Sequence, residues 1–184
     1  MCAAHLPLGP RPVVRFSATA RLLIVGQAPG LKVHQSGVPW DSNSGERLRE
    51  WLGLSNDSFY DESKVALVPM GFCYTGKGGS GDLPPRKECA PQWHGRILQL
   101  LPPAHLTLLV GSHAQAYYLR ADLHGKRDKR NMTDRVRAFK SFLPRFFPLP
   151  HPSWRSTKWI MDNRWFEAEV LPALRAEVKR HMAP

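Results

Sequence analysis

RLLIVGQAPG, from Arg21 to Gly30, is an apolar run that ends in a turn containing glycine and proline. A second apolar run, FPLPHPS from Phe147 to Ser153, ends in a His-Pro-Ser motif. Continuous apolar runs bounded by turn residues are typical of strands buried inside a parallel sheet. Because open α/β sheets bind ligands at the carboxyl ends of their strands, the two motifs are expected to form one cleft, with a backbone-rich anion pocket beside a histidine.

Apolar segments and helical patterns alternate along the chain. Four segments are predicted to be strands, of which the last is short and interrupted by a proline: residues 21–25, 64–70, 106–110 and 145–149. Apolar residues at helical spacing predict four helices: residues 44–52, 91–101, 112–119 and 165–182. This alternation favours an α/β fold with a parallel sheet covered on both faces. Two further segments, residues 74–81 and 124–130, are predicted to be exposed loops.

The composition is that of a basic protein with one core. The 184 residues include 26 Lys and Arg against 15 Asp and Glu, a formal net charge of +11 at pH 7. This excess indicates a polyanionic partner such as nucleic acid; a basic composition without a nucleic-acid role is the alternative. With 42% hydrophobic residues the chain is long enough for one sizeable core, so residues 1–184 are predicted to form a single domain.

The apolar segments are short. None of them approaches the length that crosses a bilayer, and the N-terminal region lacks the apolar core of a signal peptide. We therefore expect a cytoplasmic, nucleoid-associated protein with no membrane partner.

Three motifs in order carry a resemblance to a known family. GQAPG at residues 26–30, GVPWDSNSG at residues 37–45 and HPS at residues 151–153 resemble the uracil-DNA glycosylase superfamily, most closely its bacterial branch related to the iron–sulfur (family 4) enzymes. The resemblance extends from about Leu22 to Trp154. It implies a three-layer α/β/α sandwich with a central four-stranded parallel sheet. It also implies a monomer that hydrolyses the N-glycosidic bond of a base flipped out of DNA.

Breaking that bond makes the sugar cationic and the base anionic, so the site must donate hydrogen bonds where negative charge appears. By resemblance, His151 faces O2 of the base, and Gly26 belongs to the base-binding turn. The backbone amides of Gln27 and Ala28 are candidate donors, because the turn after a strand directs its N–H groups into the cleft. The alternatives are a histidine that packs or caps a loop, and an ordinary strand-to-helix turn.

The resemblance also identifies residues that contact the base. Trp40 stands where relatives carry an aromatic residue that stacks on the flipped base; a core tryptophan is the alternative. Relatives that read uracil strictly often carry an asparagine after the second strand, whereas this chain has Pro69 and Met70. Met70 offers only a soft apolar surface. Either backbone groups near Gly71 therefore read the base, or the pocket prefers other lesions.

Many relatives carry Asp, Asn or Glu in the first motif to position or polarise the attacking water, whereas this chain has Gln27 and Ala28 there. Gln27 is able to orient a water molecule, but it cannot take its proton. Asp41 is the nearest carboxylate in sequence and is the candidate substitute. Its alternative role is an N-terminal helix cap together with Ser42 or Ser44.

DNA contacts are expected from loops at the carboxyl edge of the sheet. Trp154 and Arg155 follow the HPS motif where relatives insert a wedge into the duplex. The candidate DNA-binding residues are Ser153, Trp154, Arg155 and Lys158, and Lys32 and Lys77 are further candidates for contacting the backbone. The cations Lys126, Arg127, Lys129 and Arg130 are interpreted as a solvated loop.

The sequence contains three cysteines, too few for a disulfide framework. Cys73 and Cys89 resemble two of the four cluster ligands of the iron–sulfur branch, whose other two ligands form an N-terminal CxxC motif. Here Cys2 is the third thiol, and His5 is the nearby alternative for the fourth ligand. The chemistry itself requires no cofactor, so a structural [4Fe-4S] cluster and three unconnected thiols are both open.

The leading functional hypothesis is a DNA glycosylase that removes uracil or another deaminated or damaged base in base excision repair. The alternative is a non-catalytic protein of the same fold that recognises damaged or single-stranded DNA, which the missing acid motivates. An unrelated nucleotide-binding α/β protein is disfavoured, because the sequence has neither a GxGxxG nor a GxxxxGK[ST] phosphate loop.

Overall fold

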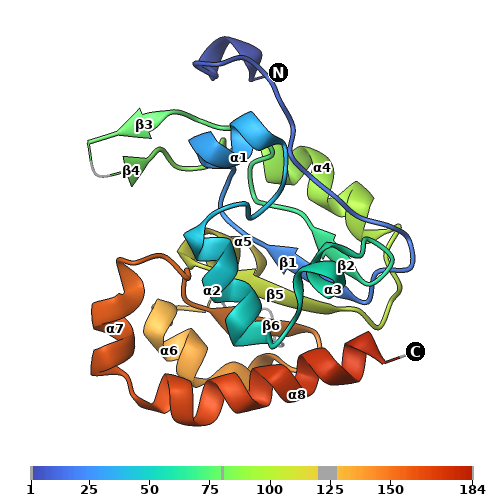
Figure 1. Ribbon diagram of the computed structural model, residues 1–184, viewed down its shortest axis with the longest axis vertical. Helices are drawn as coiled ribbons and strands as arrows, with labels where there is room; N and C mark the ends of the chain where they lie inside the picture. Colours follow the sequence, from blue (N-terminus) through green and yellow to red (C-terminus); the bar gives the residue numbers. More distant parts are fainter. Residues whose placement is uncertain (1, 80, 120–127, 184) are drawn as a thin grey trace.

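A computed structural model describes residues 2–79, 81–119 and 128–183. Its centre is a parallel sheet with strand order β2-β1-β5-β6 (Figure 1). The strands are β1 (Leu22–Val25), β2 (Val65–Leu67), β5 (Leu106–Val110) and β6 (Phe146–Leu149). All four predicted strands are present, although β2 ends three residues earlier than expected. Pro148 is accommodated because β6 is an edge strand and needs hydrogen bonds on one side only.

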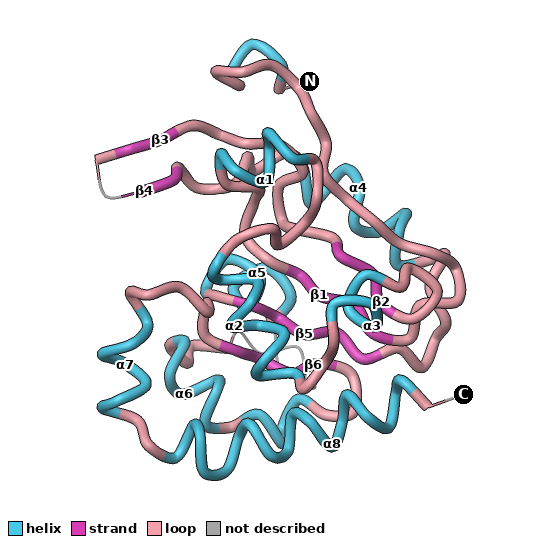
Figure 2. The backbone as a smooth tube through the Cα atoms, in the orientation of Figure 1, coloured by secondary structure: helices cyan, strands magenta, loops and turns pink. Residues whose placement is uncertain are grey.

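Alternate residues of β1 enter two different cores. Leu22 and Ile24 pack with α2 (Asn43–Leu52) and α8 (Leu171–Met182) on one face of the sheet. Leu23 and Val25 pack on the other face with α4 (Cys89–Leu98) and α5 (Ser112–Tyr118). Successive side chains of a strand point to opposite faces, so a strand buried on both sides is apolar throughout. The result is the expected three-layer α/β/α sandwich, visible in Figure 2 as helices before and behind the strands.

Several short elements have no counterpart in the sequence prediction. The segment at residues 74–81, expected to be an exposed loop, instead begins with the buried Tyr74 and Thr75 and contributes to an antiparallel hairpin. The helix predicted at residues 165–182 is present, but its first part, residues 166–170, is a π-helical turn that continues into α8. The additional elements are η1 (Ala3–His5), α1 (Leu31–Ser36), α3 (Asn56–Tyr60), β3 (Lys77–Gly78), β4 (Gly81–Asp82), α6 (Met132–Arg137), η2 (Phe139–Phe142) and α7 (Ser156–Asp162).

The second segment expected to be an exposed loop, at residues 124–130, is described only in part. Lys126 and Arg127 lie outside the described residues. Asp128 differs from the prediction of a solvated loop, because its side chain is buried and pairs with Arg130 and Arg135 at 3.0 Å each.

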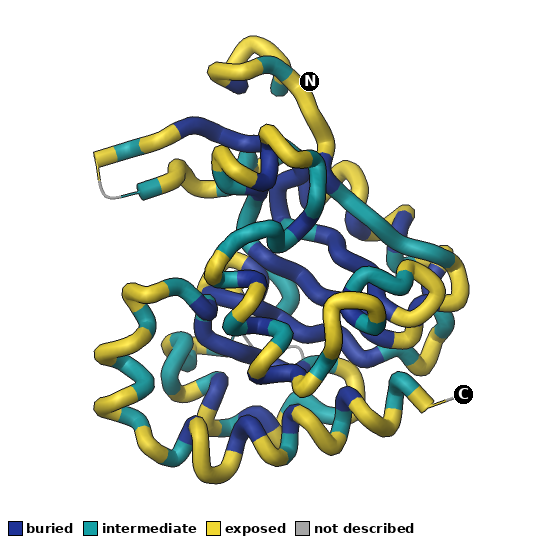
Figure 3. Tube along the Cα trace, viewed as in Figure 1, coloured by how far each residue is buried: buried dark blue, intermediate teal, exposed yellow. Residues whose placement is uncertain are grey.

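Burial follows the layers (Figure 3). The four strands of the parallel sheet are buried along their whole lengths, apart from the first residue of β6, and the outer helix faces are exposed. Within the described residues, no helix is both long and apolar enough to cross a membrane. The carboxyl ends of β1 and β6 lead into the GQAPG and HPS motifs, which therefore emerge at the same edge of the sheet.

Candidate active site

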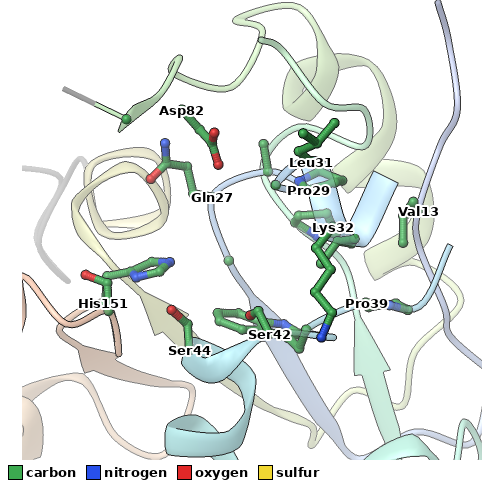
Figure 4. A pocket seen from close by; sticks show the side chains of 18 of the residues that line it. Val13, Gln27, Pro29, Leu31, Lys32, Pro39, Ser42, Ser44, Asp82 and His151 are labelled. Carbon is green, nitrogen blue, oxygen red and sulfur yellow. The ribbon is translucent and has the colours of Figure 1, made fainter. Parts of the chain in front are cut away.

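A cavity of about 520 Å³ opens at the carboxyl edge of the sheet. Its walls come from the turn after β1, the segment before α2, the β3–β4 hairpin and the loop after β6 (Figure 4). The two sequence motifs thus meet, as expected. The sequence-predicted site residues that line this cavity are Gly26, Gln27, Ala28, Trp40, His151, Ser153, Trp154 and Arg155.

The turn after β1 is fixed by the chain that follows β2. The Met70 N–H donates to the Gly26 carbonyl at 2.9 Å, and the Gly71 N–H donates to the Gln27 carbonyl at 3.0 Å. The N–H groups of Gln27 and Ala28 have no hydrogen-bond partner among the described residues. A rigid turn with unpaired N–H groups beside a cavity is an anion-binding arrangement.

His151 is the second residue after the end of β6. Its backbone is held by the Ser156 hydroxyl, which donates to the His151 carbonyl at 2.6 Å. Burial lowers the pKa of His151 from 6.5 to about 4. The imidazole is therefore neutral near pH 7, and a neutral ring still offers one N–H donor to the cavity.

Trp40 forms the wall next to His151. Its ring lies 5.9 Å from the imidazole centroid with the planes inclined by 30°. Its backbone has a φ of 60°, in the left-handed region that a non-glycine residue adopts at a cost of about 1 to 3 kcal/mol. Two glycines make room for it. A Cβ at Gly26 would lie 2.7 Å from Trp40 Cζ2, and a Cβ at Gly45 would overlap the Trp40 carbonyl oxygen.

The loop that follows His151 is tied to α2 and to the hairpin. Arg47 of α2 donates to the Ser153 carbonyl at 3.1 Å and to Thr157 Oγ1 at 3.3 Å. Arg155 lies against Gly81 of the hairpin, since a Cβ there would be 2.7 Å from Arg155 Nη2. Trp154 is 76% exposed at the rim of the cavity.

Four sequence-predicted site residues do not line the cavity: Asp41, Met70, Gly71 and Lys158. Asp41 instead forms an ion pair with Lys32 Nζ at 3.1 Å; hydrogen bonds from Lys32 and Ser36 lower the pKa of its carboxyl group. The helix cap is Ser42, which accepts from the Gly45 N–H at 3.3 Å.

The other three residues, Met70, Gly71 and Lys158, make contacts within the fold instead. Met70 packs in the core behind β1, and Gly71 is so close to Pro85 that a Cβ would lie 3.0 Å from it. Lys158 pairs with Asp162 on α7 at 3.0 Å. Of the other candidate cations, Lys32 lines the cavity, whereas Lys77 is exposed on β3 and does not.

The cavity is also lined by polar residues that the sequence analysis did not assign to the site. Ser42 and Ser44 line it from the start of α2, and Asp82 lines it from the hairpin. Figure 4 shows the Asp82 carboxylate and the Gln27 amide extending into the same hollow as His151. No local motif marks Asp82, because the fold brings the hairpin to the turn after β1 from more than fifty residues away.

The three cysteines lie outside the cavity wall, and Cys2 is close enough to Cys73 and Cys89 for its charge to act on both. Burial raises the pKa of Cys73 and of Cys89, and a charge on Cys2 raises the pKa of both further. The Phe72 N–H donates to Cys89 Sγ at 3.4 Å, as it would to a ligand sulfur. Within the described part of the chain, however, no three His, Cys, Asp or Glu side chains converge closely enough to bind one metal ion. The chain therefore supplies three of the four thiol ligands that an iron–sulfur cluster requires.

Residues 14–175 match the family model described as the uracil DNA glycosylase superfamily. The matched region contains all four strands of the sheet and every residue that lines the cavity except Val13.

Proposed function

This chain belongs to the uracil DNA glycosylase superfamily, and we propose that it is a DNA glycosylase acting in base excision repair. Its substrate is a base such as uracil, or another deaminated or damaged base, flipped from DNA into the cavity. A cavity of about 520 Å³ lies in the size range of sites that bury small ligands.

The observation that supports this proposal is the neutral His151 imidazole beside the unpaired N–H groups of Gln27 and Ala28. Cleavage leaves negative charge on the departing base, and preorganised donors stabilise charge that develops during a reaction. A neutral imidazole donates a hydrogen bond to the base without placing a second cation next to the cationic sugar. Trp40 supplies an aromatic face in the same cavity, on which a flipped base stacks.

The exterior of the site suits DNA. The net charge of +11 favours association with a polyanion, and Arg155 and the exposed Trp154 stand at the rim of the cavity. We propose that Trp154 enters the base stack while Arg155 faces phosphates. Lys32 is already paired with Asp41, and Lys158 with Asp162, so both are weaker candidates.

The choice of base is the finer part of the proposal. The chain after β2 presents Pro69 to the cavity and turns Met70 into the core. Proline has no side-chain amide with which to read the polar edge of uracil. We therefore propose that the cavity accepts more than one deaminated base.

One experiment tests the function. Purified protein is incubated with single- and double-stranded oligonucleotides carrying uracil, hypoxanthine or xanthine, and alkali-labile abasic sites are measured. We expect product with the wild type, loss of product in His151→Ala, and unchanged product in His113→Ala, whose histidine is exposed on α5. Salt-sensitive DNA binding without product from any base would instead identify a non-catalytic DNA-binding protein.

We further propose that the protein binds a [4Fe-4S] cluster, as in the iron–sulfur branch, with Cys2, Cys73 and Cys89 as ligands and His5 as the candidate fourth ligand. The proximity of the three thiols supports this proposal. The set of thiol ligands is one short of four, and the described side chains do not converge on one metal position. Protein purified under anaerobic conditions is expected to be brown and to contain iron. The Cys73→Ser variant is expected to lose both the colour and the iron. A colourless, iron-free wild type that folds normally would contradict the cluster.

We propose that the protein is a single domain and a monomer. We also propose that it acts at the nucleoid in the cytoplasm, because its proposed substrate is DNA. One chain supplies every wall of the cavity described above. Light scattering is expected to give a mass near 20.8 kDa, and thermal unfolding to give one cooperative transition. A dimer mass or two transitions would contradict these proposals.

A further inference from the structure

We propose that Asp82 is the catalytic base that accepts a proton from the attacking water, with Gln27 orienting that water. This inference rests on the proposed glycosylase function and adds to it a residue for the hydrolytic step. The residue comes from the β3–β4 hairpin, outside all three sequence motifs.

The carboxylate reaches the turn that forms the floor of the cavity. Asp82 Oδ2 lies only 3.1 Å from the position that a Cβ on Gly30 would occupy. Both Asp82 and Gln27 line the cavity, and Figure 4 shows the two side chains extending into it together. A carboxylate therefore stands beside the glutamine that lacks proton-accepting ability.

The Asp82 carboxylate is not engaged by another side chain among the described residues. Within the described residues, neither Asp82 nor Gln27 forms a side-chain hydrogen bond, and Asp82 forms no ion pair within 4.0 Å. Asp41, the rival carboxylate, is neutralised by Lys32 and lies outside the cavity wall. An unpaired carboxylate in a cavity is free to accept a proton, whereas a carboxylate paired with a lysine holds its charge more strongly.

The position of Asp82 is set by the hairpin. Asp82 pairs with Lys77 across the two strands, and the next residue, Leu83, is held at both backbone groups. The Leu83 N–H donates to the Gly76 carbonyl at 2.9 Å, and the Thr75 hydroxyl donates to the Leu83 carbonyl at 2.9 Å. Arg155 packs on Gly81, which joins the hairpin to the loop that carries His151. The base and the donor thus stand on connected parts of one wall.

The reaction balances with water as the co-reactant. The bond between sugar C1′ and the base nitrogen breaks, and its electron pair leaves with the base, which His151 stabilises by hydrogen bonding. The water oxygen forms the new bond to C1′ while its proton passes to Asp82. That proton is then released to solvent, from which the base anion is protonated.

Single-turnover excision by Asp82→Asn, Asp82→Glu and wild type tests this role, with DNA binding measured in parallel. We expect Asp82→Asn to lower the excision rate about a hundredfold, in the range of general-base contributions, and Asp82→Glu to retain part of it. DNA affinity should stay equal or rise slightly, because a negative charge is removed.

Two control variants separate this role from others. Asp41→Asn tests the rival carboxylate and Asp57→Asn the loss of an exposed one on α3; both are expected to excise at nearly the wild-type rate. Full activity in Asp82→Asn, or loss of activity in Asp41→Asn alone, would overturn the inference while the glycosylase function stands. A large fall in the melting temperature of Asp82→Asn that accounts for its loss of activity would also overturn it. An inactive wild type would contradict the proposed function itself.

Discussion

The indole of Trp40 is stacked on the imidazole of His151, with ring centroids 5.9 Å apart. Trp40 helps to shield His151 from water, and this desolvation holds the imidazole neutral. The left-handed backbone of Trp40 is accommodated by the glycines beside it, Gly26 and Gly45.

We predict that Trp40→Ala raises the pKa of His151 from about 4 toward 6.5, because water reaches the ring when the indole is removed. Trp40→Phe keeps an aromatic cover and should leave the pKa lowered. Titration of the imidazole signals by NMR measures the change. A pKa near 4 in Trp40→Ala would show that other groups bury the ring.

His151 should also link stability to pH. Burial lowers its pKa from 6.5 to about 4, so between these values the unfolded chain binds a proton that the folded chain does not. The free energy of unfolding should therefore fall as the pH is lowered through this range, by roughly 3 kcal/mol in total from this group. Urea denaturation of wild type and His151→Gln at several pH values measures the difference.

His94 is a second histidine whose pKa is lowered by desolvation, and it contributes an acid-dependent loss of stability of the same sign. Because His94 is present in both proteins, its effect cancels in the comparison. Parallel stability curves for wild type and His151→Gln would contradict the assignment to His151.

Gly45→Ala should disturb the site from the first turn of α2. The added Cβ would overlap the Trp40 carbonyl oxygen, so the backbone must shift, at a cost of roughly 1 to 3 kcal/mol. We expect lower stability and slower excision. Gly95→Ala in α4 is the matched control, since no atom lies within 4 Å of its Cβ. It should stabilise the protein by up to about 1 kcal/mol through its greater helix propensity.

Trp154→Ala should weaken action on duplex DNA more than on single strands, because a wedge is needed only where a base is paired and stacked. We expect about a tenfold loss on duplex substrate, or roughly 1.4 kcal/mol. Stability should not change, since the side chain is 76% exposed. Trp93→Ala, at an exposed tryptophan of α4, is the control for loss of indole surface. Equal losses on both substrates would argue against a wedge.

The strands were predictable because their signal is local. Residues 22–25 and 106–110 are buried on both faces, and burial on both faces requires an unbroken apolar run. Even residues 146–149 gave this signal despite Pro148. The short helix α1 and the β3–β4 hairpin gave none, since such short elements depend on tertiary contacts rather than on their own propensity.

The candidate site divides in the same way. His151 and the Gln27–Ala28 turn follow directly from strand ends, so their meeting was predictable once the sheet was parallel. Met70 was expected to contact the base, but the side chains after β2 alternate and turn it into the core. Asp41 is the carboxylate nearest in sequence to the GQAPG motif, yet it forms an ion pair with Lys32 and does not line the cavity.

By itself, the sequence determined the layered α/β fold, the edge at which the cavity opens and the superfamily to which the chain belongs. The fold and the edge follow from apolar periodicity and from turns fixed to strand ends, which are local properties, and the superfamily follows from the ordered motifs and the family match. Only the tertiary structure decided which polar groups share the cavity: it placed Trp40 on His151, paired Asp41 with Lys32, and brought Asp82 to Gln27. Such contacts join residues far apart in the chain, and their geometry depends on how whole elements pack.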